Sequence, residues 1–429
     1  MKHLLYLAII ASTVILFFYL SLNNENLIFE IISPDTWTYI DASNMLYDEM
    51  RPHPTRPLGY SLISGLPKLF DPELSDENYI RFAVLINLLA WFGSVIFFYK
   101  SLNTYFDKKT TFFLVLPFIF TLGSIAHLFI MLSETLILFL LSIISFLIVK
   151  HDKTNKIKYL VLAATILNFA ILVRPGFIYL GATTSVAMFF FLIKGKQIQI
   201  ANYIFGLFLA SIICVAGQNI AMFKEYGKTT PSFIDKTTWY CYLGAETQAE
   251  LTDTPLLDVK NSRSLFLTNM TFKKIGEISS ADLKKQLTNN PEIVIKHWLF
   301  NVARNSIAGS STLRAFSSKE TIAFSLPTIL YKITRIQNTS FTLLFLISAL
   351  FIMINPFKTK LIVYLLSIII LYIFSISGIS FWQGDRFHFV LYQMILIVFL
   401  LLIKDNRFTQ KWLKLLPHQP TPPPESAPY

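Results

Sequence analysis

The segment Ser33–Tyr60 reads SPDTWTYIDASNMLYDEMRPHPTRPLGY and follows the first long hydrophobic run of the chain. Ser33 suits the cap of a helix, Pro34 its first position and Asp35 its first turn. We expect this helix to run to about Glu49. Three prolines then end it, namely Pro52, Pro54 and Pro57.

Cationic side chains stand among these prolines, on a segment that we expect to be stiff and extended. They are Arg51, His53 and Arg56. The pattern therefore brings a carboxylate, Asp35, close to a cationic cluster beside a membrane. Asp35 has two interpretations at this point, as a helix-start residue and as a catalytic group.

The composition predicts an all-α protein that crosses the membrane many times. The chain has 429 residues, of which 54% are hydrophobic and 15% charged, and 40 are Phe. Several apolar runs reach the roughly 20 residues that a membrane-spanning helix needs. A membrane β-barrel would show short alternating segments instead.

The charge pattern predicts the topology. The net charge of +11 comes largely from lysine clusters between apolar runs, as the positive-inside rule expects, so it does not indicate nucleic acid as a partner. We expect about ten spans with both chain ends in the cytoplasm, and we interpret the first run as an uncleaved signal-anchor. The expected spans are 4–22, 79–99, 110–126, 131–149, 159–173, 177–193, 200–223, 340–354, 361–379 and 390–403.

Two long outer loops, 23–78 and 224–338, are expected to carry interfacial helices at 58–70 and 291–307. Residues 321–336 are ambiguous, but Pro327, Lys332 and Arg335 favour an interfacial helix over a span. Residues 1–416 form one transmembrane domain, and the proline-rich tail 417–429 is expected to be disordered. Cys214 and Cys241 are not expected to form a disulfide, and no metal-ligand cysteine spacing occurs.

With this topology, unusual polar residues gather at the outer ends of the spans, where ionisable groups often mark a site. An arginine at the end of a span can also reach the lipid headgroups, but the whole set predicts a cavity that is both acidic and cationic. Glu134, inside an apolar run, needs a proton or a cation, and pairing with Arg174 is the structural alternative. The set comprises Asp35, Asp41, Arg51, His53, Arg56, His127, Glu134, Arg174, Asp385, Arg386 and His388.

Such a cavity suits transfer chemistry on a phosphate. A carboxylate can act as general base toward an acceptor hydroxyl or amine, while arginines neutralise a departing phosphate. The sequence contains no glycine-rich phosphate loop or nucleotide-binding fingerprint. The expected donor is therefore a membrane-resident phosphate, such as a lipid-linked sugar phosphate, and not a soluble nucleotide sugar.

Six short segments, taken in their order along the chain, resemble the motifs of a known family. They are Asp35 with Tyr39, Arg56-Pro57-Leu58-Gly59-Tyr60, Ser133-Glu134, Val173-Arg174-Pro175, Asn290-Pro291 and Asp385-Arg386-Phe387. Together with the topology, they resemble the GT-C superfamily of integral membrane glycosyltransferases. The likeness is to the bacterial branch that contains aminoarabinose transferases and protein mannosyltransferases.

The resemblance implies an inverting transferase of the bacterial cytoplasmic membrane, with its site facing outside. Asp35 would be the catalytic base and Glu134 a second catalytic candidate. The donor would be a polyprenyl-phosphate sugar in contact with membrane lipids, and the acceptor a glycan, a lipid or a protein. The substrate- and phosphate-binding candidates are Arg51, His53, Arg56, Tyr60, His127, Arg174, Asp385, Arg386 and His388.

The chain departs from the family where Thr36 follows Asp35, because many members carry a second acid there. This leaves the use of a divalent metal such as Mg²⁺ or Mn²⁺ open. Two other functions remain. A transporter or flippase of lipid-linked glycans would favour midplane charges and internal repeats. A polysaccharide polymerase or ligase would carry key arginines and histidines in the long loop, and the one histidine of that loop is His297, on an amphipathic helix.

Overall fold

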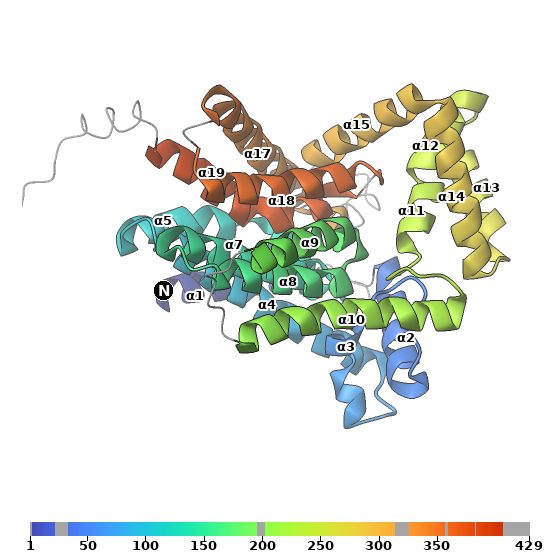
Figure 1. Cartoon of the computed structure of the whole chain (residues 1–429), viewed down its shortest axis with the longest axis horizontal. Coiled ribbons are helices and arrows are strands. Elements are labelled where there is room, and N and C mark those ends of the chain that lie inside the picture. Colours follow the sequence, from blue (N-terminus) through green and yellow to red (C-terminus); the bar gives the residue numbers. More distant parts are fainter. Residues whose placement is uncertain are drawn as a thin grey trace, which may run out of the picture.

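The structure is a computed structural model that describes residues 2–21, 33–194, 202–313, 326–356, 359–381 and 383–405. Within these ranges the chain forms helices and no strand, which confirms the all-α prediction. Long helices lie side by side, and a group of shorter helices, α11 to α14, lies across one end of them (Figure 1). The predicted disordered tail 417–429 lies outside the described residues.

The bounds of the helices follow in chain order. They are α1 Lys2–Ser21, α2 Pro34–Glu49, α3 Leu58–Ser64, η1 Leu66–Leu69, α4 Asp76–Leu102, α5 Lys108–Ile119, α6 Leu122–Ala126, η2 His127–Phe129, α7 Glu134–Thr154, α8 Lys158–Val173, η3 Pro175–Phe177, α9 Ile178–Lys194, α10 Asn202–Tyr226, α11 Ile234–Cys241, α12 Leu243–Thr252, α13 Leu256–Thr268, α14 Phe272–Asn289, α15 Pro291–Ile307, α17 Leu326–Ile354, α18 Leu361–Ser377, η5 Gly384–Phe387, η6 Phe389–Leu391 and α19 Tyr392–Asp405.

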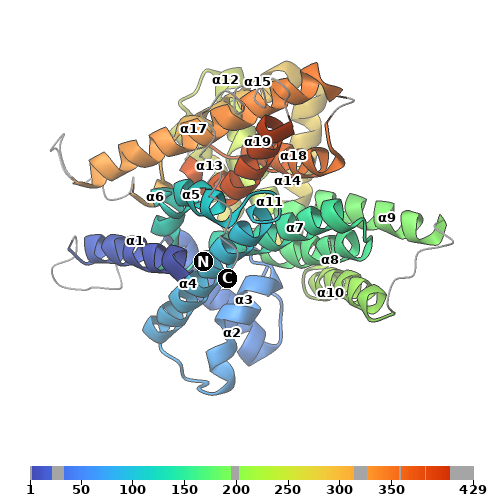
Figure 2. The same cartoon turned by 90° about the vertical axis from the view of Figure 1, so that its left-hand side faces the viewer.

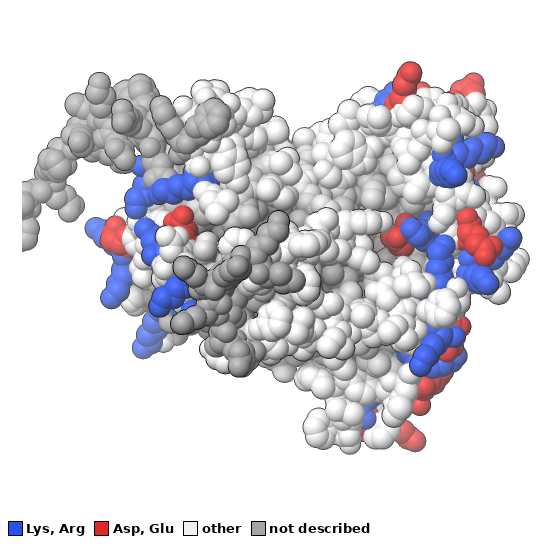
Figure 3. Space-filling model, viewed as in Figure 1, with Lys and Arg blue, Asp and Glu red and all other residues white. Residues whose placement is uncertain are grey.

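The helices are those of an integral membrane protein. In the described part of the chain, six helices are long and apolar enough to cross a membrane, or seven if the bent pair formed by 108–119 and 122–129 is one span. Two further apolar helices, α8 and α18, have 16 and 17 residues. Charged side chains gather at the two ends of the molecule and leave a nearly uncharged belt between them (Figure 3). Such a belt is what the hydrocarbon core of a bilayer requires.

The helix α2 begins and ends where the sequence predicts. The Ser33 hydroxyl accepts the backbone N–H of Asp35 at 3.0 Å, and Pro34 stands at the first position. Met50 ends the helix in the left-handed conformation, with φ at 53°, and its N–H bonds to the Met45 carbonyl. These local bonds fix the direction in which Asp35 leaves the first turn.

The predicted span 110–126 is bent by 59° between α5 and α6. The bend leaves backbone groups of Phe120 and Leu122 outside the helical ladder. The side-chain amide of Gln337, from α17, donates to the Phe120 carbonyl at 2.8 Å and accepts the Leu122 N–H at 2.9 Å. This pairing allows a broken helix at membrane depth, because it satisfies the polar groups that the bend frees.

Residues 326–336 differ from the prediction of a separate interfacial helix. They form the first turns of α17, a single helix that continues to Ile354, and residues 321–325 lie outside the described part. The polar residues there bond to the chain that follows α15. Arg335 Nε donates to the Ile307 carbonyl at 3.0 Å, and Thr334 Oγ1 accepts the Ser310 N–H at 2.9 Å. Tertiary hydrogen bonds therefore compensate for the low hydropathy of this stretch.

The predicted helix at 58–70 forms as α3 and η1, which Gly65 separates. Gly59 lies where α3 meets the end of α8, and a Cβ added there would be 2.8 Å from the Leu172 carbonyl oxygen. The lack of a side chain at Gly59 thus allows α3 to approach the segment that carries Arg174. This close packing joins the first outer loop to the end of the helix bundle.

The predicted helix 291–307 is confirmed as α15, and it packs on the bundle near α17 and α18 (Figure 2). Trp298 Nε1 donates to the Ser375 carbonyl at 2.8 Å, and the Asn305 side-chain amide donates to that of Ser377 at 2.9 Å. Ile295 and Leu299 are exposed. An exposed apolar face fits the expectation that α15 lies on the membrane surface, which stays a prediction.

Candidate functional site

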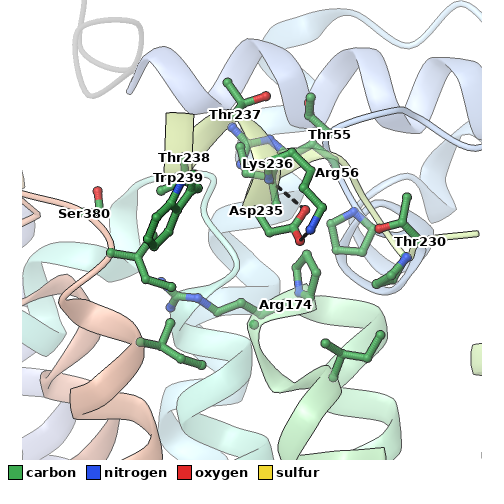
Figure 4. Close-up of a pocket in the computed structure, with 18 of the residues that line it drawn as sticks. Thr55, Arg56, Arg174, Thr230, Asp235, Lys236, Thr237, Thr238, Trp239 and Ser380 are labelled. Carbon is green, nitrogen blue, oxygen red and sulfur yellow. Dashed lines mark hydrogen bonds and ion pairs between the residues drawn. The ribbon is translucent and has the colours of Figure 1, made fainter. Parts of the chain in front are cut away.

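A cavity of about 790 Å³ lies where the segment 35–57, the bundle and the helices α11 and α14 meet. Figure 4 shows Arg56, Arg174, Lys236 and Trp239 among the side chains that line it. The volume falls within the roughly 300–1,000 Å³ typical of small-molecule sites. The cavity is therefore the main candidate site in the described part of the chain.

Residues 55–57 form part of one wall, and the proline segment that carries them is bonded to the end of α10 and the chain that follows it. The Phe233 N–H donates to the Pro54 carbonyl at 2.8 Å, and the Ser232 hydroxyl donates to that of Thr55 at 2.8 Å. The Tyr226 hydroxyl also donates to the Pro52 carbonyl at 2.8 Å. These three hydrogen bonds fix the proline segment against the end of α10 and the start of α11.

Asp35 lies at the centre of the polar contacts in the cavity. Its Oδ1 is 2.5 Å from Arg56 Nη2, and its Oδ2 is 2.8 Å from Arg386 Nη1. Burial alone would raise the pKa of Asp35, but the two guanidinium groups outweigh it and hold the pKa well below its usual range. Asp35 is therefore ionised at neutral pH, and 30% of its side chain stays exposed.

Arg56 is held in place from several sides. Its Nε donates to Thr38 Oγ1 at 2.7 Å, and its guanidinium carbon lies 4.6 Å from the centre of the Tyr39 ring. The backbone N–H of Arg56 donates to His53 Nδ1 at 3.0 Å. These contacts orient a planar cation toward Asp35, which suits recognition of a carboxylate or a phosphate.

Glu134, the first residue of α7, is almost fully buried beside two arginines. Its Oε1 pairs with Arg386 Nε and lies 3.7 Å from Arg174 Nη1, while its Oε2 has no hydrogen-bond partner in the described part of the chain. The pairing with Arg174 considered from the sequence is present, and Arg386 is the closer partner. Arg386 thus lies between two carboxylates, those of Asp35 and Glu134.

The structure brings five of the predicted site residues together along the cavity. They are Asp35, Arg56, Glu134, Arg174 and Arg386. Tyr39 also lines the cavity, and its hydroxyl donates to Ser133 at 2.9 Å, which ties α2 to the start of α7. Most pieces of the family likeness therefore meet at one place.

The other candidates of the first outer loop do not line this cavity. Arg51 is exposed and pairs with Glu49 and Glu225. Tyr60 is fully buried and packs edge-on against Tyr39.

His53 accepts the backbone N–H groups of Thr55 and Arg56 at Nδ1, and its Nε2 lies 3.1 Å from Asp41. Burial lowers the pKa of His53 to about 4, Arg56 adds to this effect and Asp41 opposes it. His53 is therefore neutral at pH 7, and its hydrogen bonds hold the backbone turn that carries Arg56. It does not contact the cavity.

Three further candidates are buried in the protein. His127 Nδ1 is 2.8 Å from the Gly123 carbonyl oxygen, and His388 Nε2 is 3.2 Å from the Ser377 hydroxyl. Asp385 is buried, and its N–H donates to the Gly309 carbonyl at 3.2 Å. Asp385 lies in η5, the turn that carries Arg386, and none of the three lines the cavity.

Sequence reasoning missed the wall contributed by the region after α10. It includes Lys228, Asp235, Lys236, Trp239 and Tyr242. The only local signal is the threonine-rich stretch around them, KTTPSFIDKTTW, and nothing in its spacing connects it to Asp35. These residues reach the cavity because α11 folds back over the proline segment.

In the described ranges, no three side chains of His, Cys, Asp or Glu lie close enough together to hold a metal ion. The carboxylates of the cavity bond to cations of the protein instead. No family model, curated protein or solved structure matches this chain. The function is therefore argued from the geometry and charge of the cavity.

Proposed function

We propose that the protein transfers a sugar from a polyprenyl-phosphate donor to an acceptor at the extracytoplasmic face of the membrane. The main observation in support of this proposal is the ionised carboxylate of Asp35, which lies between two guanidinium groups in a large cavity at the end of a membrane helix bundle. This is the combination of base and phosphate-binding cations that inverting transfer from a lipid phosphate needs.

The charge of the cavity supports an anionic ligand. Its lining contains five cations against the three carboxylates of Asp35, Glu134 and Asp235, an excess of two positive charges. The cations are Arg56, Arg174, Lys228, Lys236 and Arg386. A phosphate would balance this excess, and planar arginines can bind it through paired hydrogen bonds.

The bundle side of the cavity is apolar. Ile178 and Tyr179 from α9 and Ile376 from α18 line it, and Tyr179 is 69% exposed. The Tyr372 hydroxyl donates to the Gly176 carbonyl at 2.5 Å, which joins α18 to the start of α9. A polyprenyl chain on this apolar side would place its phosphate beside the arginines, so the cavity suits an amphipathic donor.

The proposed reaction uses the observed contacts. Asp35 takes the proton of an acceptor hydroxyl while the acceptor oxygen attacks the anomeric carbon of the sugar. The bond from that carbon to the phosphate oxygen breaks, its electron pair stays on the phosphate, and Arg56 and Arg386 stabilise the charge.

Donor binding would also strengthen Asp35 as a base. The guanidinium groups that bind the phosphate are the ones that lower the pKa of Asp35 in the free protein. When they turn to the phosphate, that pKa rises and the carboxylate accepts a proton more readily.

The ten-span topology belongs to this proposal. Six long helices, the bent pair, α8, α18 and the apolar helix α1 would make up the ten. Lysines of the short loops lie at one end of the bundle, and the cavity lies at the other (Figure 3). By the positive-inside rule the lysine-rich end faces the cytoplasm, so the cavity faces outside.

The two alternatives have weaker support. A flippase would hold its charges near the membrane midplane, whereas Glu134 begins α7 and Arg174 follows α8, so both lie at helix ends. A polymerase or ligase would use a histidine of the long loop. His297 lies outside the cavity lining, and its Nε2 is 2.8 Å from Glu250.

Binding of a lipid phosphate tests the proposal before the sugar is known. The purified protein in nanodiscs would be offered undecaprenyl phosphate or undecaprenol, and native mass spectrometry would count the lipids retained. We expect retention of the phosphate and much weaker retention of the alcohol. Equal retention of both lipids, or of neither, would contradict the proposal.

A further inference from the structure

The cavity has a second set of cationic residues, carried by other elements than the arginine cluster. They belong to a wall formed by Lys228 after α10, Lys236 and Trp239 on α11, and Ser279 and Ser280 on α14. We propose that this wall, here called the cap wall, binds an anionic sugar of the acceptor, whose charge is a phosphate or a carboxylate. This inference rests on the proposed transferase function and names the acceptor class for it.

Lys228 is the central observation. Its side chain crosses α14 at Gly276, where an added Cβ would be 2.9 Å from Nζ and 3.2 Å from Cδ. The glycine therefore leaves the space in which the lysine lies. No ion pair of Lys228 occurs in the described part of the chain, so its charge stays free to meet an anion in the cavity.

Two further groups of the cap wall lack a hydrogen-bond partner among the described residues. These are Trp239 Nε1 and Ser279 Oγ, and both atoms are buried. Buried indole N–H and hydroxyl groups normally find a partner. A sugar carries many hydroxyl oxygens, so it could supply acceptors here while its charged group meets Lys228.

Lys236 adds a second cation beside Trp239, as Figure 4 shows. Its Nζ is 3.1 Å from Asp235 Oδ2, a carboxylate that is 44% exposed. An exposed pair of this kind contributes little stability, so an anionic ligand can compete for the ammonium group. Lys236 would therefore assist Lys228 without replacing it.

The two cationic regions match the two substrates of an inverting transfer. The acceptor oxygen must attack the face of the sugar opposite to the departing phosphate. The arginine cluster holds that phosphate in the proposed function, so the acceptor needs its own site across the cavity. The cap wall comes from the segment after α10 and from α11 and α14, whereas the arginines come from the first loop and the bundle, so the two sets stand on different elements of the cavity.

The test measures sugar binding by protein in nanodiscs whose arginine cluster is first saturated with undecaprenyl phosphate. The probes are glucose 6-phosphate, glucuronate and glucose. We expect at least one anionic sugar to bind about tenfold or more tightly than glucose, because a charged group adds a charge-assisted hydrogen bond. The tighter of the two identifies the acceptor charge as phosphate or carboxylate.

Matched variants locate the site. Lys228→Ala should weaken binding of the anionic sugar by about tenfold or more, and Gly276→Ala should weaken it by displacing the lysine. Lys274→Ala is the control, because Lys274 is an exposed lysine of α14, the helix of Gly276, and it pairs with Glu277 outside the cavity. It should leave sugar affinity unchanged.

The outcomes separate the two proposals. Equal affinity for glucose and both anionic sugars, or affinity that Lys228→Ala does not change, would overturn the cap wall as a subsite. Binding that follows the anionic lipid content of the nanodisc instead of Lys228 would also overturn it. Failure of the wild-type protein to bind undecaprenyl phosphate would contradict the transferase function itself. In that case the sugar-binding measurements, repeated without the lipid, would still test whether the cap wall binds an anionic sugar.

Discussion

Arg386 Nη1 and Asp35 Oδ2 form an ion pair of 2.8 Å between residues from opposite ends of the sequence. The same guanidinium pairs with the buried Glu134 through Nε. Glu134 thus orients Arg386, while Asp35 is the partner that a phosphate can replace. In the proposed mechanism, this shared arginine would join phosphate binding to the state of the proposed base.

Replacing Arg386 should remove much of the affinity for a lipid phosphate. We expect Arg386→Ala to weaken undecaprenyl phosphate binding by about tenfold or more. Arg386→Lys should recover only part of the loss, because an ammonium lacks the planar fork. Arg81→Ala is a matched control, since Arg81 is an exposed arginine that pairs with Glu77. Unchanged affinity in Arg386→Ala would exclude a phosphate role.

His53 should make stability depend on pH. Its pKa is about 4 in the folded protein against 6.5 for a free histidine, so unfolding takes up a proton below pH 6.5. Its contribution is complete above pH 6.5 and is lost as the pH falls toward 4. At roughly 1.4 kcal/mol per pKa unit, the difference between 6.5 and about 4 is worth on the order of 3 kcal/mol.

The variant His53→Asn tests this claim, because an asparagine oxygen can still accept the turn N–H groups but does not titrate. Thermal unfolding of both proteins from pH 4 to 7.5 should show a smaller acid loss in the variant. Parallel curves for the two proteins would show that His53 does not titrate with folding.

Local signals account for what the sequence predicts well. Helix α2 and helix α15 begin where expected because Ser33, Pro34 and Pro291 act within the first helical turn. The position of Arg56 near Asp35 follows from the proline segment between them. From the sequence, Glu134 and Arg386 are connected only because both are expected at the outer ends of membrane spans.

Tertiary packing explains what the sequence does not reveal. Lys228 lines the cavity because Phe233 bonds to the Pro54 carbonyl and draws α11 over the first loop. The helix α17 includes the polar stretch around Arg335, because the Arg335 side chain bonds to the Ile307 carbonyl. Partners so distant in the chain leave no periodic or compositional pattern.

Gly59 should be sensitive to a single methyl group. In Gly59→Ala the new Cβ would be 2.8 Å from the Leu172 carbonyl oxygen, so the backbone of α3 or α8 must shift. Overpacking of this kind costs about 1–3 kcal/mol, and thermal unfolding in detergent should show a lower Tm. Gly206→Ala is the control, because nothing lies within 4 Å of its added Cβ. Equal Tm values for the two variants would contradict the close approach of α3 to α8.

Cysteine labelling should place the two charged ends on opposite sides of the membrane. In a Cys214→Ser, Cys241→Ser background, Met50→Cys should react with an impermeant reagent from outside, since Met50 is 89% exposed near the cavity end. Lys156→Cys, an exposed position in a lysine-rich loop, should react only after the membrane is opened. The reverse pattern would place the cavity in the cytoplasm and contradict the proposed donor side.

The catalytic claim rests on Asp35, and Asp35→Asn changes it with little change of size. The variant should insert, fold and bind the donor lipid, because Arg386 keeps its pairing with Glu134. Loss of a general base typically costs about 10²–10⁴-fold in rate, so transfer should fall at least about a hundredfold. Asp41→Asn is the control, since Asp41 is an exposed carboxylate that lies outside the cavity lining.

Mass spectrometry of membrane lipids and surface glycans tests the whole account most directly, because it detects whichever sugar the protein transfers. Cells that carry the wild-type gene, Asp35→Asn or Asp41→Asn would be compared at equal levels of the membrane protein. We predict that Asp35→Asn cells accumulate one sugar-bearing polyprenyl phosphate and lose that sugar from one acceptor, while Asp41→Asn cells match the wild type. Identical lipid and glycan profiles in all three would contradict the proposed transferase function of the cavity.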